Sequence, residues 1–478
     1  MTKFIGRERE LADVNAEFSA RRPSLVVVYG RRRIGKSTLL QHAAAECQSA
    51  SVYFQATKLE EKMNLDAFKA EVVQALGQDP VLDGLSDWSS VLYWLARAAE
   101  TRPGLIVILD EFPYISENEQ ALPSVIQKFW DSGAMKKGNM KLVLCGSLIA
   151  QMEKLLSESN PLYGRRTMAF ELGAMSLRDS AQFLPHYSTA DKIVAYSVFG
   201  GIPYYLQTCD SSVSLKDNIV RNVMSQSGPL YDEPEFLLQS ELRDTTRYSS
   251  IVGAIATGAN KTAEIISRVG LNDVAQLTPY LDRLVRMRIL EKQRPFAGSP
   301  KSRDTRYSIV DPIFKFWHRF VRPNMSAVAR GFGEDVYSRK VLPFWSDYMG
   351  LAFEDACREH LRLFAQERLS VPAQEIGKIW SGEYDLDVAG KLLDSSLVFG
   401  ECKWETQELG ESVLAKLKRN AALATRNASD ASCHFVLFSK KGFTPGLQKV
   451  AEIDAQVVLY DLDDLVDSPP VYDPTPHP

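Results

Sequence analysis

The stretch that decides the fold runs from Leu25 to Leu40 and has the sequence LVVVYGRRRIGKSTLL. An apolar, β-branched run leads into a basic loop bracketed by glycines, and the loop opens into a helical pattern. Gly30, Gly35, Lys36 and Ser37 match G-x-x-x-x-G-K-[ST], the phosphate-binding loop. Glycines let backbone N–H groups surround an anion, and the following helix N-terminus adds positive potential. The stretch therefore predicts a nucleotide-binding domain.

Two side chains of this loop have defined tasks in nucleotide binding. Lys36 can reach the β- and γ-phosphates, and Ser37 can ligate Mg²⁺. The bland alternative is a chance match in a basic loop, but the strand before it and the helix after it are the context that the motif demands. The full set of expected nucleotide contacts in the loop is Gly30, Arg31, Arg33, Ile34, Gly35, Lys36, Ser37 and Thr38.

Length and composition set the frame for the rest of the chain. Its 478 residues suggest about three domains. The formal net charge of −4 means that any nucleic-acid surface must be local. The six cysteines are scattered without C-x-x-C pairs, which predicts reduced thiols in a cytosolic protein. Because there is no apolar signal region and no membrane-length apolar run, we expect a cytoplasmic protein with no membrane association.

A second apolar run, LIVILDE at residues 105–111, ends in two acids. A fully apolar strand is typical of a central parallel sheet, and ligands bind at the carboxyl ends of such strands. This is the Walker B pattern, in which Asp110 would hold Mg²⁺ through water and Glu111 would orient or deprotonate the attacking water. The alternative is a solvated strand end with two acids, which the loop upstream disfavours.

Three further candidates follow in the N-terminal half, each with an open alternative. Ser147 ends the strand 141–147 and could sense the γ-phosphate or position water, or simply end the strand in a turn. Arg165, in the sequence YGRR at 163–166, is a candidate arginine finger that acts on a neighbouring copy, or else a solvated arginine. Pro203 lies in a helical region and could close over the adenine with its aromatic neighbours.

Six short motifs follow one another along the first half of the chain: FIGR at 4–7, the phosphate-binding loop, LDEFPY at 109–114, Gly146-Ser147, YGR at 163–165 and GGIP at 200–203. In this order the chain resembles the archaeal-type ATPases of the AAA+/STAND group. The resemblance covers roughly the first half. It implies an α/β fold with a parallel-sheet ATPase core and a helical lid, ATP as the nucleotide with Mg²⁺, and association into a homo-oligomer.

The middle of the chain predicts a winged helix. Helices are expected at 248–256, from 261 and over 273–287, and a β-hairpin at 289–292 and 306–309. Three helices followed by a hairpin is the winged-helix arrangement. Basic residues exceed acidic ones here, as on a face that contacts phosphates. DNA contact and a packing or assembly role both remain open.

The C-terminal third places acids and a lysine on neighbouring elements. Glu354 falls in a helix, Asp385 and Asp387 share one face of an alternating strand, and Glu401 and Lys403 share a face of the next strand. Carboxylates facing Glu-x-Lys form a hard-oxygen site for Mg²⁺ or Mn²⁺. Such a metal activates water for attack on a phosphodiester, and the lysine positions that water or stabilises charge.

This order of residues resembles the PD-(D/E)xK restriction-endonuclease-like fold, although the Pro-Asp dipeptide is missing. The resemblance implies Glu354, Asp385, Asp387 and Glu401 as candidate metal ligands and Lys403 as the catalytic lysine. Two aspartates compete for one role, and Asp385 is slightly favoured. The alternative is a retained fold with an inactive charged face.

The sequence thus predicts an ATPase core at 1–175, a helical lid at 176–238, a winged helix at 239–325, a nuclease-like domain at 335–466 and a disordered tail at 467–478. The first hypothesis is an ATPase coupled to a metal-dependent nuclease that acts on DNA. The second is an ATP-controlled signalling or oligomerisation switch that binds partners or DNA without cleavage. The third is a transcription regulator that binds DNA through Arg283 and Arg286 of the winged helix.

Overall fold

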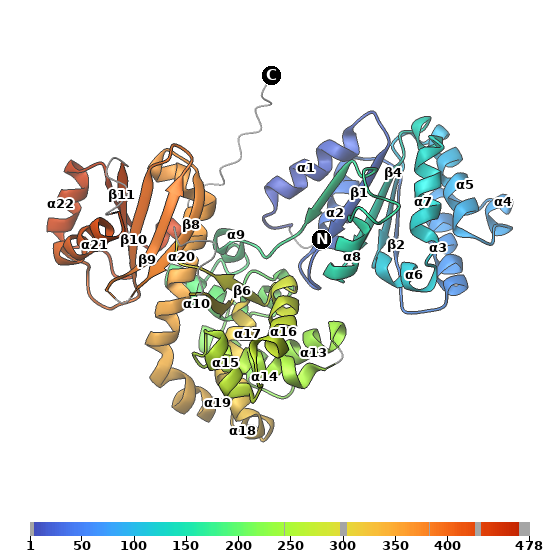
Figure 1. Ribbon diagram of the computed structural model, residues 1–478. Helices are drawn as coiled ribbons and strands as arrows, with labels where there is room; N and C mark the ends of the chain where they lie inside the picture. The colour runs from blue at the N-terminus through green and yellow to red at the C-terminus, as the bar shows by residue number, and fades with distance from the viewer. Residues whose placement is uncertain (1–3, 243, 297–303, 382, 426–431, 468–478) are drawn as a thin grey trace. The chain divides into compact units, whose positions relative to one another are not determined.

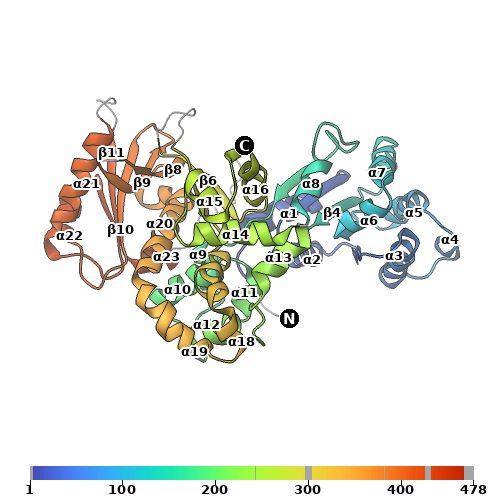
Figure 2. The same cartoon turned by 60° about the horizontal axis from the view of Figure 1, so that its bottom comes forward.

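The computed structural model describes residues 4–242, 244–296, 304–381, 383–425 and 432–467. The chain divides into two compact units, Met1–Ala174 and Met175–Pro478 (Figures 1 and 2). The tail predicted to be disordered lies outside the described residues from position 468 onward. The five-part domain division stays a prediction.

The first unit is built on one parallel sheet with the strand order β2-β3-β4-β1-β5. Every neighbouring pair in it is parallel. The central strands β3 and β4 are buried along their whole length, because helices cover both faces. The strands are β1 (Ser24–Tyr29), β2 (Ser51–Gln55), β3 (Ile106–Asp110), β4 (Lys141–Gly146) and β5 (Met168–Glu171).

Alternation along β1 divides the core between the two faces of this sheet. Val26 and Val28 pack with Leu40 of α2 on one face. Leu25 and Val27 belong to the larger cluster on the other face, which includes residues of α3, α5 and α7. The helices of this unit are α1 (Glu8–Ser19), α2 (Lys36–Glu46), α3 (Glu61–Leu76), α4 (Pro80–Asp83), α5 (Trp88–Thr101), α6 (Phe112–Asn118), α7 (Leu122–Asp131) and α8 (Ile149–Leu155).

The second unit begins with helices and then contains three helices followed by a two-stranded antiparallel sheet. These last elements occur in the order predicted for a winged helix, an assignment that stays a prediction. The initial helices are α9 (Leu177–Ala181), α10 (Thr189–Phe199), α11 (Pro203–Gln207), α12 (Leu215–Val223) and α13 (Glu233–Glu241). The later elements are α14 (Thr245–Ala256), α15 (Thr262–Val269), α16 (Val274–Arg286), β6 (Leu290–Gln293) and β7 (Arg306–Ile309).

Two π-helical turns, Trp317–Val321 and Tyr337–Val341, interrupt the helices that follow. Each turn is followed by a proline, Pro323 or Pro343, inside a short 3₁₀ segment. A proline has no N–H to donate and its ring clashes with the carbonyl four residues earlier, so the helix widens before it. The helices around these turns are α17 (Pro312–Phe316), α18 (Met325–Ala329), α19 (Gly333–Val336) and α20 (Trp345–Leu369).

The C-terminal sheet is mixed, with the strand order β12-β11-β10-β9-β8. Strands β8, β9 and β10 run antiparallel, whereas β10, β11 and β12 run parallel. Leu386, Ala389 and Phe399 pack with Leu414 and Leu447 of two covering helices. The elements are β8 (Ala373–Trp380), β9 (Asp385–Leu392), β10 (Leu397–Lys403), α21 (Glu411–Ala424), β11 (Cys433–Ser439), α22 (Pro445–Ile453), β12 (Val457–Tyr460) and α23 (Leu462–Val466).

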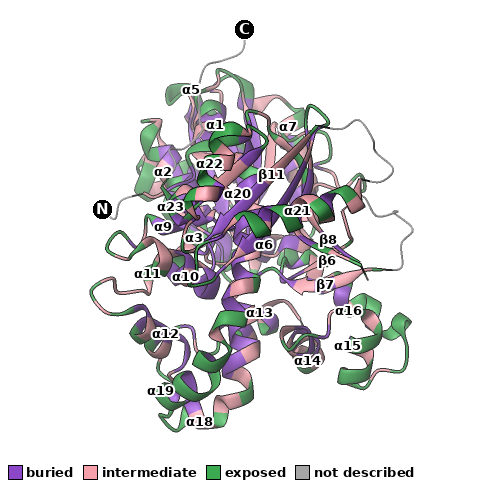
Figure 3. Cartoon of the chain, turned by 90° about the vertical axis from the view of Figure 1, so that its left-hand side faces the viewer, coloured by how far each residue is buried: buried purple, intermediate pink, exposed green. Residues whose placement is uncertain are grey.

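Helix α20 packs against β8, β9 and β10 of this sheet. Buried residues recur along one side of α20, and β11 is buried over its second half (Figure 3). The strand β5 was not expected from sequence. Its four residues are all half-buried, because it lies at the sheet edge, so it lacks the apolar run that marks the central strands.

Candidate functional sites

The phosphate-binding loop joins β1 to α2 and needs its glycines for space and conformation. A Cβ atom on Gly30 would lie 2.3 Å from the carbonyl oxygen of Leu172, so no larger residue fits there. Gly35 has φ 96° and Arg33 has φ 66°, both in the left-handed region. The loop therefore holds a tight curve directly before the first turn of α2.

Lys36 lies across this loop. Its Nζ donates hydrogen bonds to the carbonyl oxygens of Gly30 and Arg31, each at 2.9 Å, and the residue is only 6% exposed. The ammonium group is thus held beside the space that the loop encloses, where it can meet a phosphate. Of the other predicted loop contacts, Ile34 is buried and Thr38 is exposed.

Asp110 at the end of β3 collects three donors. Ser37 Oγ and Tyr53 OH donate to its Oδ2 at 2.5 and 2.7 Å, and the Glu111 backbone N–H donates to Oδ1 at 2.9 Å. Burial and the Asp110 charge raise the pKa of Tyr53, so the phenol stays a donor. A serine hydroxyl beside a buried carboxylate is a hard-oxygen donor set, which fits Mg²⁺.

Glu111 lies beside Ser147 because β4 is the sheet neighbour of β3. The Ser147 hydroxyl and backbone N–H donate to Glu111 Oε2 at 2.8 and 3.2 Å. Glu111 has φ 51°, a left-handed conformation that is costly for a residue with a side chain and is concentrated at functional sites. Ser147 is fully buried, so it acts on Glu111 rather than on solvent.

Arg165 is held within its own domain. Its Nε and Nη2 bond both carboxylate oxygens of Asp131, at 2.8 and 2.9 Å, and Nη1 donates to the carbonyls of Pro161 and Tyr163. The Arg165 hydrogen bond lowers the pKa of Asp131. Its role as an arginine finger stays a prediction. Pro203 begins α11 in the second unit, and its contact with adenine also stays a prediction.

Sequence reasoning missed two residues at the nucleotide site. One is Tyr53, whose hydroxyl reaches Asp110 only because β2 pairs with β3. The other is Arg7, whose Nη2 donates to the Gly173 carbonyl at 2.6 Å and to the Ile34 carbonyl at 3.3 Å. Arg7 thereby ties the phosphate-binding loop to the segment that follows β5. The FIGR motif at residues 4–7 is the sequence signal that could have indicated it.

The second site lies on β9 and β10 of the C-terminal sheet. Lys403 Nζ is 2.7 Å from Glu401 Oε1 and 4.0 Å from Asp387 Oδ2. Asp387 Oδ2 also accepts a hydrogen bond from the Cys402 backbone N–H at 2.9 Å. The exposed Lys416 lies 3.6 Å from the same oxygen of Glu401. The charge pairing raises the pKa of Lys403 against the opposing effect of its burial.

The geometry favours Asp387 over Asp385 as the aspartate of this site, and the role of either as a metal ligand stays a prediction. Asp385 is exposed at the first residue of β9, and its Oδ1 accepts a hydrogen bond from the Ser381 N–H at 3.1 Å. Asp387 is the aspartate beside Glu401 and Lys403. Period-two alternation puts both aspartates on one face, but about 6.6 Å separates residues i and i+2 along a strand, and alternation cannot say which one meets the neighbour.

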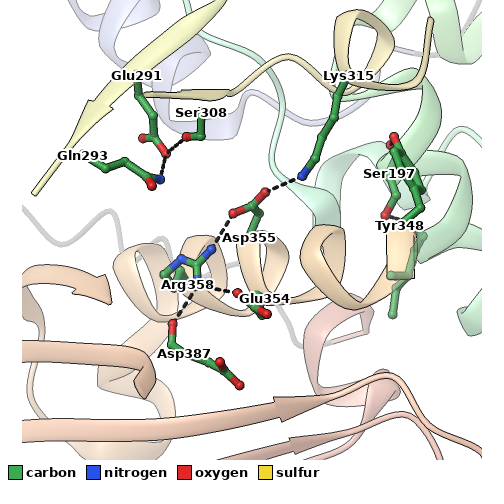
Figure 4. A network of polar contacts seen from close by, with 11 residues as sticks. Ser197, Glu291, Gln293, Ser308, Lys315, Tyr348, Glu354, Asp355, Arg358 and Asp387 are labelled. Carbon is green, nitrogen blue, oxygen red and sulfur yellow. Dashed lines mark hydrogen bonds and ion pairs between the residues drawn. The ribbon is translucent and has the colours of Figure 1, made fainter. Parts of the chain in front are cut away.

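Glu354 approaches the same site from α20 (Figure 4). Arg358 links them: its Nη1 lies 3.5 Å from Glu354 Oε2 and donates to the Asp387 carbonyl oxygen at 2.6 Å. Arg358 Nη2 also bonds Asp355, which pairs with Lys315. Burial and the charge of Asp387 raise the pKa of Glu354 to about 7. Burial and the charge of Glu401 raise the pKa of Asp387.

Glu354, Asp387, Glu401 and Lys403 are called the carboxylate–lysine site below. Its oxygens are of the kind that Mg²⁺ and Mn²⁺ prefer, and two of its carboxylates have raised pKa values that a cation would relieve. In the described part of the chain, however, no three His, Cys, Asp or Glu side chains are gathered as a ready metal-binding group. Lys403 stands between Asp387 and Glu401 in this conformation.

The part of the chain that contains the first site is similar to known ATPases. Residues 4–209 match a family described as an ATPase domain predominantly from Archaea. A Walker-type ATPase from Pyrococcus abyssi has the same fold, with a TM-score of 0.52 and 19% identity over 66% of this chain and 96% of that one. Residues 4–209 thus match an ATPase family, and the chain shares the fold of a Walker-type ATPase.

The chain also has relatives without a described activity. Residues 317–417 match a family of archaeal and bacterial proteins of unknown function, and this segment contains the carboxylate–lysine site. An uncharacterized protein of Methanocaldococcus jannaschii is 29% identical over 406 residues, which are 84% of this chain and 88% of the relative. Within the described residues, no helix has both the length and the apolar character to cross a membrane.

Proposed function

We propose that the protein hydrolyses Mg²⁺-bound ATP at the first site. The observation that carries this is the arrangement at the ends of β1 and β3, where Ser37 meets Asp110 and Glu111 follows directly. Mg²⁺, when bound, neutralises charge on the phosphates. The loop N–H groups and Lys36 would hold those phosphates, and Glu111 would orient or deprotonate the attacking water.

The test is steady-state phosphate release by the purified full chain with ATP and Mg²⁺. Lys36→Ala removes the phosphate-binding ammonium, and we expect nucleotide affinity and hydrolysis both to collapse. Glu111→Gln keeps the size of the side chain but not its basicity, so we expect ATP binding to persist while turnover falls by roughly 10²–10⁴-fold. Full activity in Glu111→Gln would contradict the assignment.

A second candidate function is metal-dependent cleavage of nucleic-acid phosphodiesters, with DNA as the favoured substrate, at the carboxylate–lysine site. It is favoured by one observation: Lys403 lies between two carboxylates on neighbouring strands, with Glu354 held nearby through Arg358. When bound, the metal ion would supply Lewis-acid activation of water. Glu354, Asp387 and Glu401 would be its ligands, and Lys403 would release Glu401 and stabilise developing phosphate charge.

The two aspartates of β9 provide a matched pair for this test. Single- and double-stranded DNA and RNA would be incubated with the full chain and Mg²⁺ or Mn²⁺, with and without ATP. We expect Asp387→Asn and Glu401→Gln to abolish cleavage, and Asp385→Asn to keep it. Equal loss in Asp385→Asn and Asp387→Asn would reject the assignment of Asp387. Cleavage in Glu401→Gln as strong as in the wild type would falsify the nuclease function.

The same experiment separates the nuclease from an ATP-controlled switch. If Lys36→Ala also stops cleavage, nucleotide binding at the first unit gates the second site. If no substrate is cut but ATP increases the size of the particle in light scattering, the switch is the function. Arg165 is tested by mixing Arg165→Ala with Lys36→Ala subunits, because a finger that acts on a neighbouring copy would restore hydrolysis in the mixture.

A further inference from the structure

The second unit contains a groove of about 630 Å³. Its walls come from the end of α14 and the residues that follow it, the antiparallel hairpin, α17, the two π-helical turns, α20 and β8. Basic side chains from four of these elements reach it: Arg306 of β7, Arg319 and Lys340 of the two π-helical turns, and Lys378 of β8. We call it the basic groove, defined by these four residues.

The charges of the basic groove are unbalanced. Within the described part of the chain, no carboxylate lies within ion-pair distance of Arg306, Arg319, Lys340 or Lys378. Arg306 Nε is buried and has no hydrogen-bond partner there. The two acids in the wall are Glu354 and Asp355, and Asp355 is already paired with Lys315 and Arg358. Surplus cations in a concave surface attract a polyanion.

Two arginines of the groove are held in place by aromatic rings. The Arg306 guanidinium lies 4.6 Å from the centre of the Trp380 ring, and that of Arg319 lies 5.2 Å from the Phe320 ring. Stacking fixes a guanidinium while leaving its N–H donors for a phosphate. The side chain of Phe344, which also lines the groove, is half exposed. Bases stack on such rings without regard to sequence.

The groove also meets the carboxylate–lysine site. Glu354 lines it, and Arg358 connects Glu354 to Asp387 (Figure 4). A volume of about 630 Å³ is that of a small-ligand pocket, about 300–1,000 Å³, which admits a few nucleotides of one strand but no duplex. Burial and the nearby Arg358 lower the pKa of Lys378, a cost that a bound phosphate would offset.

We propose that the basic groove binds a single strand of nucleic acid and leads its backbone to the carboxylate–lysine site. This proposal deepens the second candidate function and rests on it, because cleavage is the reason why the groove would bind a strand. Phosphates contact the four basic side chains, and a base stacks on Phe344. The substrate of the second unit is then a single strand or a single-stranded end.

Adjacent residues of one π-helical turn give a matched test. Lys340 is exposed in the groove, whereas Arg339 is 79% exposed, pairs with Asp335 and does not line it. Lys340→Glu and Arg339→Glu change the net charge equally at neighbouring positions. Binding of a fluorescein-labelled oligo(dT) of about twelve nucleotides would be followed by fluorescence anisotropy. The full chain is used in EDTA, so that no cleavage occurs.

We expect Lys340→Glu to weaken binding about tenfold and to reduce the salt dependence, and Arg339→Glu to change affinity less than about twofold. A duplex of the same length binds more weakly, and free dTMP at equal nucleotide concentration does not compete. Equal loss in both variants, preference for the duplex, or competition by dTMP would overturn the proposal.

Cleavage is read separately from binding. Binding that depends on Lys340 without any cleavage in Mg²⁺ or Mn²⁺ upholds the groove and rejects the nuclease. Cleavage with binding that does not depend on Lys340 rejects the groove and upholds the nuclease.

Discussion

Ser147, directly after β4, donates two hydrogen bonds to the carboxylate of Glu111, directly after β3. The contact exists because β4 lies between β1 and β3 in the sheet. It places the end of β4 next to both the phosphate-binding loop and the Walker B acids. Ser147 therefore orients the carboxylate that we propose acts on water.

Removal of the Ser147 hydroxyl tests this orientation. We expect Ser147→Ala to lower kcat about tenfold and to leave the Kd for ATP unchanged, because only the orientation of the Glu111 carboxylate becomes less fixed. Ser116→Ala on α6 is the control, since its hydroxyl donates to the Pro113 carbonyl and not to Glu111. The rate of ATP hydrolysis gives kcat, and titration with a fluorescent nucleotide gives Kd. A rise in Kd with unchanged kcat would instead make Ser147 a nucleotide contact.

Tyr53→Phe removes one of the donors to Asp110. The carboxylate is then less neutralised, so we expect tighter Mg²⁺ binding, with half-maximal hydrolysis at about threefold lower Mg²⁺. Tyr93→Phe, on the exposed side of α5, is the matched control. A Mg²⁺ titration of ATP hydrolysis gives the answer, and a requirement for more Mg²⁺ in Tyr53→Phe would show that the phenol helps to build the site.

Arg358 neutralises two acids from a buried position, with its side chain 3% exposed. We expect Arg358→Met to destabilise the second unit by about 3–5 kcal/mol, because it leaves Glu354 and Asp355 without their partner. Arg339→Ala, at an exposed pair, should change stability by less than about 0.5 kcal/mol. Thermal unfolding followed by circular dichroism measures both, and equal midpoints for the two variants would contradict the role of Arg358.

The stability of the second unit should fall in acid because of His318. The residue is 1% exposed, and burial together with the charge of Arg322 lowers its pKa to about 3. Unfolded histidine takes up a proton near pH 6.5, which the folded chain does not, so stability decreases as pH falls from about 6.5 toward 3. At pH 5 the loss amounts to about 2 kcal/mol.

His318→Phe removes this proton uptake and should flatten the acid side of the stability profile. Part of the loss remains, because His360 has its pKa lowered to about 3 in the same way, mainly by burial. His186→Gln, at an exposed histidine, is the control. Unfolding midpoints at pH 7.5 and 5 are the measurement. A parallel decline in the His318→Phe and wild-type proteins would show that other groups control acid stability.

Contiguous motifs could be predicted from the sequence. The loop from Gly30 to Thr38 and the acids at the end of β3 depend on local backbone conformation and on a single apolar run, so their order along the chain is enough. Edge elements such as β5 were missed, because their burial is partial and their pattern is weak.

What the sequence determined alone is the set of chemical groups: a phosphate-binding loop, two Walker B acids, and carboxylates with a lysine in the last third. Only the tertiary structure decided which of them meet. It placed Asp387, and not Asp385, beside Lys403, joined Ser147 to Glu111, and gathered Arg306, Arg319, Lys340 and Lys378 around one groove. The physical reason is that strand order, register and helix packing join residues far apart in the chain, and no local pattern encodes those distances.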